Sequence, residues 1–210
     1  MLFGASCADT RFTYVSNNDA GIFVRLPADY EPISQSYVDY FFASDLSPIE
    51  LEFYENAQWV AMFRPADVAV QEVGSGSFLT TAGVSEPLGF VSARALPIDD
   101  QIGTSRQSLG LIPADPVPVN PFVTISGSSP LVEVGQINIA SVVDGYGGTL
   151  VEWNERLANS SDYTTHRRLR LNDPAMSREV ELHVWCSAAC FDANKTTIDE
   201  IFASLEIATN

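Results

Sequence analysis

Three cysteines are the residues of this chain whose type and spacing carry the most chemistry. Cys186 and Cys190 lie close together near the C-terminus, and Cys7 follows the small residues 4–6 near the start. A close pair of thiols can form a disulfide, and disulfides persist in oxidising compartments outside the cytoplasm. We therefore predict a Cys186–Cys190 disulfide. Two unlinked buried thiols, or a redox or metal-binding pair, are the alternatives, although zinc would need two further ligands.

Cys7 stands where the lipid is attached in a bacterial lipoprotein, directly behind a few small residues. Residues 1–3 supply neither the charged segment nor the apolar stretch that precedes such a cysteine. Lipidation of Cys7 therefore requires a start further upstream, with 1–10 as the remnant of the signal. The alternative is an unmodified thiol in a frayed terminus. The odd cysteine favours lipidation, because an exported domain seldom leaves one thiol unpaired.

A basic strip is the second group of residues with chemical potential. In a strand, His166, Arg168 and Arg170 share one face, because side chains alternate from residue to residue. Guanidinium groups bind carboxylates and phosphates through paired hydrogen bonds. The strip therefore predicts a site for an anion or a protein partner. The alternative is a solvated sheet face that balances an acidic body.

The two histidines of the chain, His166 and His183, are the candidates for a general base. A hydrolase would need one of them in a cleft beside a serine, cysteine or carboxylate. Strand alternation places His183 on the opposite face from Cys186, which disfavours a shared metal site. The chain has neither a Walker lysine motif nor a Gly-x-Ser-x-Gly motif. We predict no catalytic residue, no metal and no cofactor.

Charge restricts the classes of partner. The formal net charge is −16, from 27 acidic and 11 basic residues. Such a surface repels phosphate backbones, so we expect no nucleic-acid partner and no polybasic membrane contact. No run approaches the roughly 18 apolar residues of a membrane-spanning helix. Any membrane attachment is therefore expected through a lipid anchor alone.

Period-two alternation of apolar and polar residues dominates the chain and predicts strands. Short turns between the later segments indicate antiparallel pairing. A hairpin is expected from 49–53 and 59–63. Further strands are expected at 21–26, 89–96, 131–143, 149–157, 163–171 and 179–187.

One helix is expected to close the fold at 197–206. Thr197 and Glu200 have the spacing of a capping box. Apolar residues at 198, 201, 202 and 205 form one helical face, which should lie on the sheet. Two further helices are expected at 35–43 and 102–111, and four prolines make 112–121 a surface connector. Strands with a few segregated helices indicate an α+β domain.

The C-terminal stretch resembles a known family. A strand that runs into Cys186-x-x-x-Cys190-Phe191, then Asn194 and a helix that reaches Ser204, is similar to the C-terminal signature of actinobacterial secreted lipoproteins with a PsbP-like fold. Residues 21–30 and 104–109 resemble two other segments of that family. The resemblance implies an antiparallel sheet sandwiched between helices. It also implies binding or assembly work without catalysis.

These observations predict one PsbP-like α+β domain over 11–208. The expected protein is an extracytoplasmic, lipid-anchored or secreted, non-catalytic binding or assembly module of the cell envelope. Its partner would be an envelope protein or a small ligand. The alternatives are a hydrolase with a histidine base and a carrier of a small apolar ligand, whose cavity would be lined by Trp59, Trp153 and Trp185.

Overall fold

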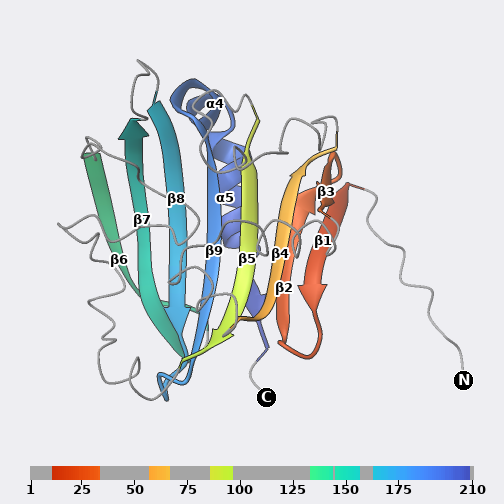
Figure 1. The fold of residues 1–210 in the computed structure, drawn as a ribbon, viewed down its shortest axis with the longest axis vertical. Coiled ribbons are helices and arrows are strands. Elements are labelled where there is room, and N and C mark those ends of the chain that lie inside the picture. Colours follow the sequence, from red (N-terminus) through yellow and green to blue (C-terminus); the bar gives the residue numbers. More distant parts are fainter. Residues whose placement is uncertain are drawn as a thin grey trace, which may run out of the picture.

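The computed structural model describes residues 11–33, 57–66, 86–96, 133–143, 145–156 and 163–208. Within these residues the chain forms ten strands and two short helices (Figure 1). The strands are β1 (Phe12–Asn17), β2 (Ile22–Pro27), β3 (Tyr30–Pro32), β4 (Ala57–Pro65), β5 (Leu88–Ala95), β6 (Glu133–Val143), β7 (Tyr146–Arg156), β8 (Tyr163–Asn172), β9 (Arg178–Ser187) and β10 (Glu206–Ile207). The helices are α4 (Ala188–Ala193) and α5 (Lys195–Ala203).

The strands form two antiparallel sheets. The large sheet has seven strands in the order β3-β4-β5-β9-β8-β7-β6, and the small sheet has three in the order β1-β2-β10. Tightly connected neighbours pair as expected, with β7 beside β8 and β8 beside β9 along their whole lengths. Gly148 permits the close approach of β7 to β8, because a Cβ there would collide with the Arg170 carbonyl oxygen.

The hydrophobic core lies between one face of the large sheet and a layer made of the small sheet and the two helices (Figure 1). Alternate residues of β9, from Val180 through Leu182 and Val184 to Cys186, point into it. From the other side come Ile22, Val24 and Leu26 of β2, together with Ile198 and Ile201 of α5. This arrangement leaves the odd-numbered residues of β9 on the opposite face of the large sheet.

The predicted α+β sandwich is wrong. The described residues are mostly antiparallel β-structure, and their two helices lie on one face of the large sheet only. The small sheet occupies much of the layer that helices were expected to fill. The expected helices at 35–43 and 102–111, the strand at 49–53 and the connector at 112–121 lie outside the described residues.

The expected C-terminal helix exists with different bounds. Helix α5 begins at Lys195 rather than at Thr197, and Asn194 occupies the N-cap position without a side-chain hydrogen bond. The predicted capping box is therefore absent, but Ile198, Ile201 and Phe202 form the expected buried face. The chain then enters β10 at Glu206, where it pairs with β2. Helix α4 was not predicted.

Candidate functional site: the charged face of the large sheet

A layer of charged and aromatic side chains covers the face of the large sheet that points away from the hydrophobic core. The pairing register brings these side chains together, with His166 opposite both Trp185 and Trp153, and His183 opposite both Arg168 and Phe90. We call this layer the charged face. It consists of Phe90, Ser92 and Arg94 of β5, Trp153 of β7, His166, Arg168 and Arg170 of β8, and Glu179, Glu181, His183 and Trp185 of β9.

The charged face is buried. His166 is 2% exposed, Arg168 is 3% exposed and His183 is completely inaccessible. The interpretation of the basic strip as a solvated sheet face is therefore wrong. The structure does bring the three strip residues together on one face, as alternation predicted, with Arg170 the least deeply buried of them. Their role in binding an anion or a partner stays a prediction.

Two ion pairs neutralise most of the charge on this face. Arg94 Nε lies 2.8 Å from Glu179 Oε1, and Arg170 Nε lies 2.6 Å from Glu181 Oε2. Burial by itself would raise the pKa of Glu179, but the charges of Arg170 and Arg94 outweigh it and lower that pKa. Burial likewise opposes the charge of Arg170, yet the two glutamates raise its pKa overall. Both pairs are therefore held in the charged form.

Arg168 is stabilised differently. Its guanidinium carbon lies 5.3 Å from the ring centroid of Trp153, within cation–π range. Burial is the largest influence on this side chain, and together with the charge of Arg170 it lowers the pKa of Arg168 to about 10. Arg168 therefore stays charged at neutral pH and is a strong positive charge beside the two histidines.

The two histidines form a buried pair. His166 Nδ1 lies 3.2 Å from His183 Nε2, so one ring donates a hydrogen bond and the other accepts it. The ring of His166 stacks on Trp153 with centroids 4.8 Å apart, and His183 meets Phe90 edge to face at 5.4 Å. Burial, reinforced by Arg168, lowers the pKa of His166 to about 3, and burial and His166 lower that of His183. Both rings are neutral at physiological pH.

Within the described residues, the geometry of the pair gives the hydrolase hypothesis no support. The hydrogen bond of His183 goes to another imidazole, and its Nδ1 has no hydrogen-bond partner in the described part of the chain. A ring whose pKa lies far below neutrality is a weak proton acceptor for a catalytic step at pH 7. The carrier hypothesis expected three tryptophans around one cavity. Trp153 and Trp185 lie on the charged face, whereas Trp59 packs against the hydrophobic core.

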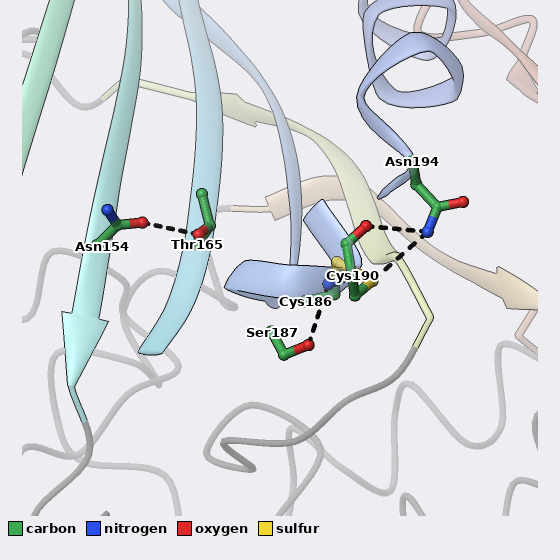
Figure 2. Close-up of a disulfide and its surroundings, with 6 residues drawn as sticks. All are labelled: Asn154, Thr165, Cys186, Ser187, Cys190 and Asn194. Atoms are coloured by element: carbon green, nitrogen blue, oxygen red, sulfur yellow. Dashed lines mark hydrogen bonds between the residues drawn. A yellow bond between two sulfur atoms is a disulfide. The ribbon is translucent and has the colours of Figure 1, made fainter. Parts of the chain in front are cut away.

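The predicted disulfide is confirmed. Cys186 at the end of β9 is bonded to Cys190 in α4, with the Cα atoms 5.9 Å apart (Figure 2). Ser187 caps α4, since its side-chain oxygen accepts a hydrogen bond from the Cys190 amide at 3.3 Å. Asn194 donates from Nδ2 to the Cys190 carbonyl oxygen at 3.0 Å. The bridge and these two polar contacts fix the turn that leads from the sheet into the helices.

Sequence reasoning missed the role of Arg167, which points to the opposite face from the strip. Its guanidinium group pairs with Glu152 of β7 at 2.7 Å and with Asp199 of α5. It also lies over the rings of Phe191 and Phe202, at 5.3 and 5.7 Å from their centroids. Arg167 thus joins both helices to the large sheet. A charged residue at a core-facing position of an alternating strand was the available signal.

Cys7 lies outside the described residues, so its lipidation stays a prediction. Over the described ranges, no three histidine, cysteine or acidic side chains gather into a group that could hold a metal ion. In the same ranges no helix is long and apolar enough to cross a membrane.

Comparisons with known proteins give no family. No protein-family model and no curated protein matches the chain. Among solved structures, cyanobacterial PsbP (CyanoP) from Synechocystis sp. PCC 6803 matches at 10% identity over 99% of both chains, with a TM-score of 0.47. PA94, a Pseudomonas aeruginosa protein of unknown function, matches at 11% identity over 95% of this chain and 99% of its own, with a TM-score of 0.43. At TM-scores below 0.5 neither match carries a conclusion about fold or function, and none of the comparisons shows an actinobacterial lipoprotein family.

Proposed function

We propose that this chain is a non-catalytic binding or assembly domain of the cell envelope, exported from the cytoplasm and anchored to the membrane by a lipid on Cys7. The observation that carries the proposal is the disulfide between Cys186 and Cys190. Disulfides of this structural kind are rare in cytosolic proteins and common in exported ones.

The surroundings of the bridge support a structural role rather than a catalytic one. Cys186 is completely buried, and Cys190 is nearly so. Reactive cysteines sit in partly exposed positions where a thiolate can form and reach a substrate. The buried bridge instead stabilises the junction of β9 and α4.

The charged face supports a non-catalytic role. Its carboxylates are paired with arginines, and its two histidines are neutral and bonded to each other. Such a network holds the interior in one arrangement, because breaking either ion pair would leave a buried charge without its partner.

Fractionation of native-host cells that express the full reading frame tests whether the protein is anchored to the membrane. We expect the natural protein to stay with membranes after a high-salt wash and to be released by detergent. Cys7→Ser should move it to the soluble fraction, because the lipid acceptor is lost. Ser6→Ala, which keeps a small residue before the cysteine, is the matched control and should leave the protein with membranes. A membrane-bound Cys7→Ser variant, or natural protein in the cytosol, would overturn the proposal.

A further inference from the structure

The outer face of the small sheet presents aromatic rings beside an arginine. Tyr14 of β1 lies directly opposite Arg25 of β2, and both are exposed. Tyr14 is 54% exposed and is the one large hydrophobic side chain exposed to this degree in the described ranges. Phe12 and Phe23 flank the pair and are half-buried. We call Phe12, Tyr14, Phe23 and Arg25 the hairpin patch.

The hairpin patch is held in place from behind. The guanidinium carbon of Arg25 lies 4.4 Å from the ring centroid of Phe12, so cation and ring are stacked on the surface. Ser204, at the end of α5, accepts a hydrogen bond from the Arg25 amide at 3.0 Å and contacts the Arg25 carbonyl oxygen at 3.0 Å. The backbone beneath the patch is therefore fixed by the helix, and a preorganised surface loses little entropy on binding.

The patch is also close in sequence to Cys7. Phe12 lies five positions after Cys7, and an extended chain covers at most about 3.5 Å per residue. The start of β1 must therefore lie within roughly 18 Å of the Cys7 backbone. A lipid on Cys7 would hold the patch near the membrane surface.

We propose that the hairpin patch docks on the anionic lipid headgroups of the membrane in which Cys7 is anchored, an inference that rests on the proposed function. The tyrosine ring favours the headgroup level of a bilayer, where its apolar body and polar tip are both accommodated, and phenylalanine rings bury their apolar surface at the boundary with the acyl chains. The Arg25 guanidinium group can pair with a lipid phosphate through two hydrogen bonds. The contact would set the orientation of the domain on the membrane.

Charge complementarity separates this surface from the rest of the molecule. The chain carries a net charge of −16, which repels an anionic bilayer. Strands β1 and β2, with sequences FTYVSN and IFVRLP, contain no acidic residue. The exposed Glu206 of β10 lies opposite Phe23. Arg11 and Arg25 both lie over the Phe12 ring, so the Phe12 end of the hairpin patch is its positive end and can approach anionic lipid.

A chemical tether tests the docking without relying on lipidation in the cell. With the disulfide closed, Cys7 is the free thiol of the chain and can be coupled to a maleimide lipid in phosphatidylcholine vesicles, with or without phosphatidylglycerol. The vesicles also contain a lipid with a nitroxide headgroup, which quenches nearby tryptophan. The probe is Tyr14→Trp, read against the parent chain, whose own three tryptophans give the background.

We expect extra quenching of Tyr14→Trp on vesicles that contain phosphatidylglycerol, and its loss when Arg25→Glu is added. Lys195→Glu reverses an exposed charge on α5 and should leave the quenching unchanged. Equal quenching with and without Arg25→Glu, or none on either vesicle, would overturn the docking and leave the patch to a protein partner. Because the tether is supplied chemically, such a failure is distinct from a failure of Cys7 to be lipidated in cells.

Discussion

At the scale of residues, the histidine pair links stability to pH. The pKa of His166 is lowered to about 3 and that of His183 is lowered as well, whereas both are near 6.5 in an unfolded chain. The unfolded state therefore binds protons first as the pH falls. The contribution of the pair is complete above about pH 6.5 and is lost progressively toward pH 3. Between pH 6 and 5, we expect the free energy of unfolding to fall by about 1 kcal/mol per pH unit for each histidine.

Urea unfolding at several pH values measures this slope. The chain has only two histidines, so both imidazoles that titrate in this window belong to the pair. In a double variant, His166→Gln with His183→Gln, the slope between pH 6 and 5 should be nearly flat, whatever its absolute stability. If the natural chain and the variant have the same slope, the neutral buried pair is contradicted. If the variant fails to fold, an NMR titration of the two imidazole rings in the natural chain gives an independent check of their pKa values.

The arrangement of the charged face was predictable from the sequence only in part. Alternation along β8 and β9 correctly placed the strip residues on one face of the sheet. It also placed His183 and Cys186 on different faces of β9. It could not predict that the charged face is buried, because burial depends on which segments pack above it. The ion pairs with Glu179 and Glu181 depend on the register between strands, which the hydrophobic pattern alone does not fix.

At the scale of elements, the contacts of Arg167 hold α4 and α5 against the large sheet. Arg167→Ala removes two ion pairs and two cation–π contacts and leaves a gap beneath α4 and α5. We expect a loss of about 2–4 kcal/mol in the free energy of unfolding, measured by urea denaturation. Asp199→Asn removes one carboxylate that is half exposed, so it should cost less than about 1 kcal/mol. If both substitutions lowered the free energy of unfolding equally, the role of Arg167 in holding the helices on the large sheet would be refuted.

The disulfide acts on the same junction between sheet and helices. In the chain-entropy model, a loop this short contributes about 2 kcal/mol to stability. Replacing both cysteines, Cys186→Ala with Cys190→Ala, should lower the free energy of unfolding by about that amount. Reducing agent should destabilise the natural chain and leave the double variant unchanged. A natural chain insensitive to reductant would contradict the structural role of the bridge.

Helix α5 shows why element boundaries were harder to predict than element types. Its apolar face at Ile198, Ile201 and Phe202 determines a helix, and the structure has one there. Its start was misplaced because Thr197 has the spacing of a capping residue, while Asn194 already ends α4 and begins α5. Six residues are too few to give α4 a periodic pattern, so the capping side chain of Ser187 was its main signal.

At the scale of the whole molecule, the strands of the large sheet other than β3 were predictable, whereas the layer above them was predictable only at β2 and α5. Residues 163–171 and 179–187 were predicted as strands almost to their ends, because apolar and polar residues alternate there. Two of the three strands of the small sheet, β1 and β10, were not predicted. A two-residue strand such as β10 exists only through its pairing with β2, so local sequence carries little sign of it.

Counting free thiols tests whether this is an exported domain closed by one disulfide. Protein purified from its native host is denatured without reductant, alkylated, and analysed by mass spectrometry for the peptides that carry Cys186 and Cys190. We expect neither cysteine to be labelled and the two peptides to remain joined. Labelling of both cysteines would contradict the disulfide, and with it the argument that the protein works outside the cytoplasm.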